Sequence, residues 1–265
     1  MLEREPTTPE ETLLNLKTIV GGLAGLAVLA IGAFALWFFV LREDGPEAVS
    51  TDSALEALDN ATATAASGTT PAAGATSAPT TSGSTASTGL NGSWTVDTTV
   101  ESFVGYRVQE QLAGIGGVEA VGRTPKVTGT VTIAANKATA GTITADMTAL
   151  KSQEAMRDGQ LRNQGIEYGK FPTSEFKLTG AVDVPASVET GTTAQVTLKG
   201  DLTLHGVTKA VEVPAEVTLK NGTLVVVGQV TVQFSDYSIS KPTSPRVVGM
   251  EDKAVMELQL FFKKS

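Results

Sequence analysis

Residues 211–232, VEVPAEVTLKNGTLVVVGQVTV, consist of two runs in which apolar side chains alternate, separated by Asn221-Gly222. An Asn-Gly pair readily takes the two positive φ angles of a type I′ turn, so this stretch predicts a tight β-hairpin. The turn sets the register, which pairs Leu219 with Leu224, Val217 with Val226, Ala215 with Gly228, Val213 with Val230, and Val211 with Val232. Pro214 would then oppose Gln229 at a hydrogen-bonded position. Because proline has no N–H, we expect a bulge or a lost pair there.

The same alternation extends on both sides of this hairpin. It recurs at 103–108, 127–133, 141–147, 176–180, 196–204 and 254–262, which predicts about eight strands, each with one apolar face. A short helix is expected at about 152–163, SQEAMRDGQLRN. The fold class is therefore all-β. Antiparallel strands with one apolar face form either a sandwich or a closed barrel, and closure removes the exposed edges.

An apolar stretch precedes these strands. Residues 18–41, TIVGGLAGLAVLAIGAFALWFFVL, contain no charge, and a helix of this length would be about 36 Å long, enough to cross a bilayer. A cleavable signal peptide is the alternative, but its apolar part is normally about 7 to 15 residues long. We therefore expect a single transmembrane helix at 18–41, with 1–17 as a short acidic cytoplasmic tail and the rest of the chain outside the cytoplasm.

Residues 42–92 separate this stretch from the strands. Within them, 61–89 contain only Ala, Thr, Ser, Gly and Pro, so no large apolar side chain is available to offset the entropy of ordering. The composition predicts a disordered, flexible linker over 42–92. The folded domain is expected to cover 93–265, a usual size for one domain.

Composition excludes several kinds of chemistry. The chain has no cysteine and one histidine, so disulfides, thiolate nucleophiles, iron–sulfur clusters and multi-histidine metal sites are excluded. Residues 1–60 carry a net charge of −7, whereas the residues from Ser93 onward carry −1. A basic patch for nucleic acid is therefore not expected. We expect no cofactor, no metal and no nucleic-acid partner.

Two groups of residues are candidates for catalysis or for binding an anion. His205 lies between two strands, where closing a hairpin is a simpler role than acting as a general base, because no orienting carboxylate or nucleophile stands out. Arg157, Asp158 and Arg162 lie at helical spacing and either bind an anionic headgroup or form ion pairs on a solvated helix.

Small residues recur in the row that faces the interior. They are Gly129, Gly141, Gly180, Gly200, Ala215 and Gly228. An eight-stranded barrel is just wide enough to be filled by its own side chains or to hold one small ligand. The missing side chains either open a cavity or mark bends in the strands, and the residues alone leave both possibilities open.

A set of motifs carries a family resemblance. In chain order they are WTVD at 94–97, SFVGYRV at 102–108, VTG at 127–129, MRDGQLR at 156–162, FPTSEF at 171–176 and GDLTLHGVTK at 200–209. Together they resemble the YceI-like domain of bacterial exported proteins. The resemblance implies an extended, lipocalin-like, eight-stranded antiparallel barrel whose apolar interior holds a polyisoprenoid or similar amphiphilic lipid.

The resemblance suggests a non-enzymatic lipid-binding protein. The expected contacts with the lipid tail are Phe103, Phe176, Leu178, Val196, Leu198, Leu202, Leu204, Val230, Val232, Phe234, Leu258 and Leu260. The expected partners are this lipid, the cell membrane through 18–41, and a second copy of the chain in a homodimer. The alternative is a barrel packed solid, with an outer face or loops such as 240–249 contacting other cell-envelope proteins.

Overall fold

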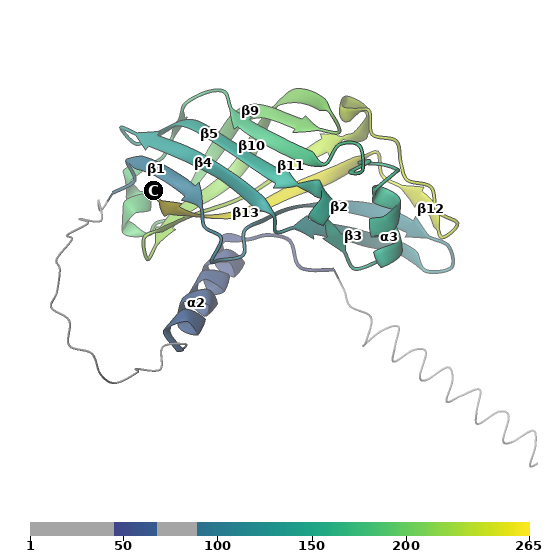
Figure 1. Cartoon of the computed structure of the whole chain (residues 1–265), viewed down its shortest axis with the longest axis horizontal. Helices are drawn as coiled ribbons and strands as arrows, with labels where there is room; N and C mark the ends of the chain where they lie inside the picture. Colours follow the sequence, from purple (N-terminus) through teal and green to yellow (C-terminus); the bar gives the residue numbers. More distant parts are fainter. Residues whose placement is uncertain (1–44, 68–88) are drawn as a thin grey trace, which may run out of the picture. The chain divides into compact units, whose positions relative to one another are not determined.

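The structure, a computed structural model, describes residues 45–67 and 89–265 (Figure 1). Its strands are β1 (Gly92–Val96), β2 (Phe103–Leu112), β3 (Gly116–Thr124), β4 (Val127–Ala134), β5 (Lys137–Asp146), β6 (Lys151–Ser152), β7 (Thr173–Leu178), β8 (Val182–Asp183), β9 (Ala194–Leu204), β10 (Val207–Lys220), β11 (Thr223–Gln233), β12 (Val247–Met250) and β13 (Lys253–Lys264). The helices are α2 (Thr51–Ser67) and α3 (Ala155–Leu161), with short 3₁₀ turns η1 (Met147–Ala149), η2 (Ala186–Thr190) and η3 (Phe234–Tyr237).

The predicted hairpin joins β10 and β11. Asn221 and Gly222 have φ angles of 53° and 79°, as a type I′ turn requires. The ladder runs from Lys220–Thr223 to Ala215–Gly228 and stops there, so the pair expected to be lost at Pro214 is indeed lost. Beyond this point β10 pairs only with β9, and β11 only with β13. The expected pairs of Val213 with Val230 and of Val211 with Val232 therefore do not form.

Eight strands close into an antiparallel barrel, which confirms the predicted architecture and excludes a sandwich. Their order is β1-β4-β5-β7-β9-β10-β11-β13, and β13 pairs back onto β1. One member of this ring, β1, was not marked by alternation. The predicted strand at 103–108 lies in β2, which pairs with the other part of β13 and continues the wall through β3 and β6.

The wall stays bonded where β1 ends and β2 begins. At this break the backbone N–H of Asp97 donates to the carbonyl of Phe261 at 2.7 Å, and the N–H of Phe261 donates to the hydroxyl of Ser102 at 3.0 Å. Both backbone groups of Phe261 therefore keep partners although neither β1 nor β2 pairs with it. As a result, β13 keeps hydrogen-bonded partners along both of its sides.

The interior is divided into two apolar layers. The first surrounds Trp94 and includes Val188 of η2, Leu224 and Phe262. The second surrounds Tyr237 and includes Val108, Leu204 and Val232. The short helix α3, predicted at about 152–163, packs through Leu161 against Met147 and Leu150 next to the second layer.

Helix α2 corrects the predicted linker. Residues 51–67 form a helix that packs on the outside of the barrel, where Ala54 and Leu58 contact Val225, Val227 and Phe261. Ala54 and Leu58 are four residues apart and so share one helix face. The composition argument was wrong for 61–67, which belong to α2, and it overlooked the apolar residues further upstream. The parts of the predicted linker at 42–44 and 68–88 lie outside the described residues.

A buried ion cluster fixes the segment before α2. The carboxylate of Glu257 on β13 is fully buried on the outer face, where it accepts from Arg107 and Arg123, each at 2.7 Å. The same two guanidinium groups donate to the backbone carbonyls of Pro46 and Glu47. Buried charges persist only when they are paired and fully hydrogen-bonded, so these carbonyls complete the cluster.

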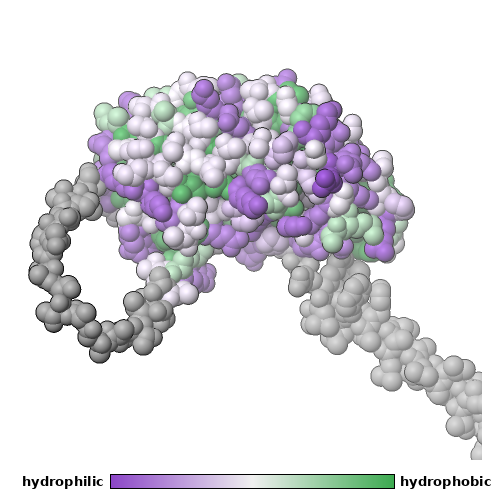
Figure 2. All heavy atoms as spheres, in the orientation of Figure 1, coloured by the Kyte–Doolittle hydropathy of each residue, from purple (hydrophilic) through white to green (hydrophobic). Residues whose placement is uncertain are grey.

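The predicted tail at 1–17 and transmembrane helix at 18–41 lie outside the described residues. Among residues 45–67 and 89–265, no helix has both the length and the apolar character needed to cross a membrane. The face shown in Figure 2 is mostly hydrophilic or neutral, with only small separate hydrophobic areas. On this face, large apolar side chains therefore do not gather into one exposed patch.

Replacing Leu58 tests whether α2 is part of the folded unit. Leu58 is 3% exposed, so Leu58→Ala should lower the free energy of unfolding in urea by about 2 kcal/mol, because it leaves a cavity against Phe261. Glu56→Ala, on the exposed face of the same helix, should leave stability unchanged. Equal effects of the two variants would show that α2 does not stabilise the barrel.

Candidate functional site

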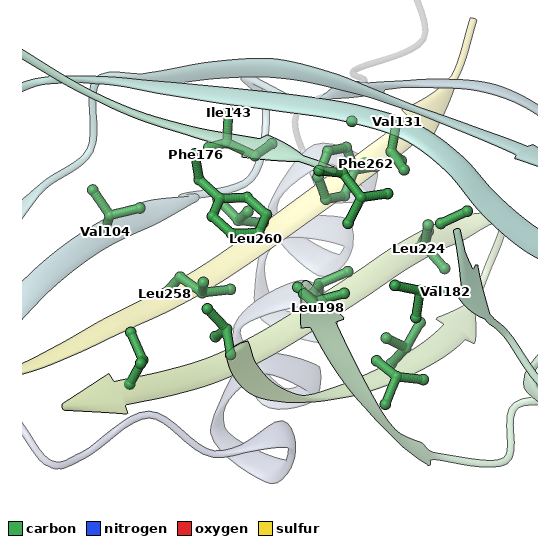
Figure 3. A pocket seen from close by; sticks show the side chains of 18 of the residues that line it. Val104, Val131, Ile143, Phe176, Val182, Leu198, Leu224, Leu258, Leu260 and Phe262 are labelled. Carbon is green, nitrogen blue, oxygen red and sulfur yellow. The ribbon is translucent and has the colours of Figure 1, made fainter. Parts of the chain in front are cut away.

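A cavity lies inside the barrel and is lined by residues of both interior layers. Its volume is about 140 Å³. Walls come from β4, β5, β7, β9, β10, β11 and β13, with Val104 of β2 and Val182 of β8. In Figure 3 the side chains of Ile143, Phe176 and Leu258 converge on this space from different strands. The cavity therefore lies inside the ring of strands.

The lining is almost wholly apolar. Only Thr130, Ser174 and Glu257 among the lining residues carry polar side chains. The Ser174 hydroxyl donates to the carbonyl of Thr203 at 3.0 Å, and the Glu257 carboxylate is paired with arginines on the outer face. An apolar cavity of this kind stays dry and accepts apolar guests. The lining therefore suits hydrocarbon.

Most residues proposed to contact the lipid tail meet at this cavity. Those that line it are Phe176, Leu178, Val196, Leu198, Leu202, Val230, Leu258 and Leu260. The other four, Phe103, Leu204, Val232 and Phe234, do not line it. The positions of these four residues therefore do not support contact with a lipid in the cavity.

These four residues lie elsewhere for two reasons. Phe103 precedes the cavity-lining Val104 on β2, so alternation turns it outward, where the Arg123 guanidinium lies 4.2 Å from its ring centre. Leu204 and Val232 each lie two residues beyond a cavity-lining residue on the same strand, Leu202 and Val230, and with Phe234 they pack in the cluster around Tyr237. Strand alternation distinguishes the inner from the outer face but not one level of the barrel from another.

Several cavity residues were not proposed from the sequence. Val131, Ile143 and Leu224 lie within predicted strands and follow the same alternation, so the pattern could have identified them. Val182 and Val184 also line the cavity, next to the two-residue strand β8. A strand this short leaves no periodic signal in the sequence.

The inward glycines mostly serve close packing rather than open space. A Cβ on Gly129 would lie 2.4 Å from the carbonyl oxygen of Thr142, and one on Gly200 would lie 2.4 Å from the ring of Phe176. A Cβ on Gly228 would lie 3.0 Å from the Pro214 carbonyl. Of the six inward small residues proposed from the sequence, only Gly141 lines the cavity, and a Cβ there would meet nothing closer than 3.6 Å.

His205 closes a hairpin, which confirms the simpler of its two predicted roles. With Gly206 it forms the β9–β10 turn, at φ angles of 52° and 73°. Its Nδ1 lies 3.0 Å from the carbonyl of Tyr237, and its Nε2 lies 2.7 Å from the Glu167 carboxylate. The ring also makes an edge contact with Phe171, with 4.4 Å between ring centres. His205 therefore ties three loops together at one end of the barrel.

The charged residues of α3 are mostly engaged within the protein. Arg157 donates to Glu110 at 2.8 Å, and Asp158 accepts from the backbone N–H and hydroxyl of Ser152. Arg162, which follows α3, is exposed. Within the described parts of the chain, no three His, Cys, Asp or Glu side chains gather where they could hold a metal ion.

Comparisons with known proteins identify relatives by sequence and by fold. The family model described as YceI-like domain matches residues 94–262. UPF0312 proteins from Vibrio parahaemolyticus and Vibrio campbellii are 31% and 32% identical over 116 residues, which cover 41% of this chain. The match spans 58% of the length of each of these relatives.

A solved structure shares the fold. The polyisoprenoid binding domain from Saccharophagus degradans, implicated in plant cell wall breakdown, has a TM-score of 0.50 and 16% sequence identity. The match covers 65% of this chain and 98% of that domain. At this identity the likeness concerns the fold alone.

The substitution His205→Asn removes the ring contacts of His205 and keeps the backbone of the turn. His205→Asn creates Asn-Gly, the preferred pair for this turn, so the backbone is not penalised. Loss of the ring contacts with Tyr237 and Glu167 should lower the free energy of unfolding in urea by about 2–3 kcal/mol. Glu167→Gln should cost less, because an amide can still pair with the ring. Unchanged stability would contradict this structural role.

Proposed function

The chain belongs to the YceI-like family through residues 94–262, and from this premise we propose that its barrel binds a polyisoprenoid or similar amphiphilic lipid. The observation that carries the proposal is the apolar cavity enclosed by the ring of strands. The polyisoprenoid binding named for the domain from Saccharophagus degradans supports the ligand class. Carriage, storage and protection from stress are roles that such binding would serve.

Hydrophobic transfer is sufficient to hold the tail. Burial of hydrocarbon stabilises a complex by about 0.8 kcal/mol per methylene, so even a part of an isoprenoid chain in the cavity gives useful affinity. Because the lining offers little hydrogen bonding, affinity should follow the length of the tail. No reacting group is required, and we propose a binding protein rather than an enzyme.

Membrane attachment remains part of the proposal. The uncharged stretch 18–41 would anchor the chain, with 1–17 in the cytoplasm and the barrel outside it. Residues 46–58 contact the barrel and so do not act as a free spacer.

The alternative of a solid barrel is less well supported by the interior. Residues of both interior layers, such as Leu198 of the first and Leu202 of the second, line the cavity. Part of the loop 240–249, proposed as a protein contact, is held by pairing of β12 with β2. Lipid binding is therefore the better-supported proposal.

Extraction of the native protein tests the proposal directly. Full-length protein purified gently from native membranes should release an isoprenoid when extracted with organic solvent, and mass spectrometry should identify it. Such a lipid should be present in stoichiometric rather than trace amounts. Protein that is folded and contains no lipid would count against the proposal.

Filling the cavity should abolish binding without unfolding the barrel. Gly141 has no positive φ and has room for a Cβ, so Gly141→Leu should place its side chain in the cavity and lower lipid uptake at least tenfold. Thermal unfolding should change little. Gly117→Leu, on an exposed strand position, controls for the substitution itself. Undiminished uptake in Gly141→Leu would place the ligand elsewhere.

A further inference from the structure

Two of the three tyrosines have hydroxyls without a partner. The Tyr168 hydroxyl donates to the carbonyl of Asp158 at 2.8 Å. The hydroxyls of Tyr106 and Tyr237 are buried and make no hydrogen bond, although both rings pack in the second interior layer. Tyr237 is only 2% exposed. A buried hydroxyl normally has a hydrogen-bond partner, so these two hydroxyls indicate a partner that binds there.

Tyr106 lies directly next to the cavity. It follows the lining residue Val104 by two positions on β2 and is paired with Met256, which also lines the cavity. Across β3 it faces Gly122, where a Cβ would lie only 2.4 Å from the Tyr106 ring. The absence of a side chain at Gly122 lets the phenol lie against the backbone of β3. Tyr106 therefore lies at the end of the cavity that Val104 and Met256 line.

The charges around Tyr106 favour a neutral guest. Burial raises the pKa of Tyr106, as do Glu110 and Asp158, while Arg157 opposes them, so the phenol stays protonated and can donate. Arg157 is already paired with Glu110 at 2.8 Å. With Asp158 included, these three side chains sum to one negative charge. A phosphate would be repelled, whereas a hydroxyl or carbonyl oxygen would not.

We propose that the Tyr106 and Tyr237 hydroxyls form the head-group end of the ligand site and donate to a neutral oxygen, a hydroxyl or carbonyl, of an amphiphile whose tail fills the cavity. This inference rests on the proposed lipid binding. It defines the polar part of the ligand, which an apolar cavity alone leaves open.

The test compares ligands that share a tail but differ in the head. Phytanol, phytanyl diphosphate and the hydrocarbon phytane are titrated against the full chain by fluorescence competition. Wild type should prefer the alcohol to both other ligands. Tyr106→Phe and Tyr237→Phe should each weaken alcohol binding about three- to tenfold and leave phytane binding unchanged. Neither variant should destabilise the empty protein, because each removes an unpartnered hydroxyl.

Tyr168→Phe is the matched control. It removes a hydroxyl that has a partner, so it should lower stability and leave the affinities for all three ligands unchanged. Tighter binding of the diphosphate, or unchanged alcohol affinity in both Tyr106→Phe and Tyr237→Phe, would overturn the head-group site while leaving lipid binding intact. Loss of stability in both variants would assign the hydroxyls to bound water instead. Failure of wild type to bind any of the three ligands would overturn the proposed function itself.

Discussion

The pairing of β13 on both of its sides is the constraint on which the barrel depends. Along one side it forms eleven residue pairs with β11. Along the other side it pairs first with β2 and then with β1, and Phe261 bridges the break through Asp97 and Ser102. Without the contact to β1, the sheet would keep two open edges and the apolar row would face water. The cavity is therefore enclosed only because the barrel closes.

The same strand also organises the outer face. Phe261 and Glu257 point away from the interior, and each is covered by the segment that precedes the barrel in sequence. Phe261 is covered by α2, and Glu257 is neutralised by two arginines that also bind the carbonyls of Pro46 and Glu47. Without this cover the Phe261 ring would be exposed to water, and without the arginines the buried charge of Glu257 would be unpaired. The domain of this chain is thus larger than the 94–262 family match.

The sequence predicted the features that depend on local periodicity. Alternation and Asn221-Gly222 were sufficient for every strand of the ring except β1, for the hairpin and for the lost pair at Pro214. Features that depend on where strands lie along the barrel axis were not predictable in this way. Leu204 and Leu202 share a face and a strand, yet only Leu202 lines the cavity. Likewise, composition predicted a linker and so missed helix α2 at 51–67, because the docking of Leu58 depends on a distant partner, Phe261.

Closure also decides how the interior can recognise a guest. In the wall, backbone N–H and C=O groups are used in strand pairing, so a ligand inside finds few of them available. Discrimination between guests then falls to polar side chains that the fold has not already satisfied. Ser174 donates to Thr203, and Glu257 faces the arginines outside. Among the described residues this leaves the buried hydroxyls of Tyr106 and Tyr237. An apolar cavity followed by unpartnered hydroxyls suits an amphiphile that inserts its tail first.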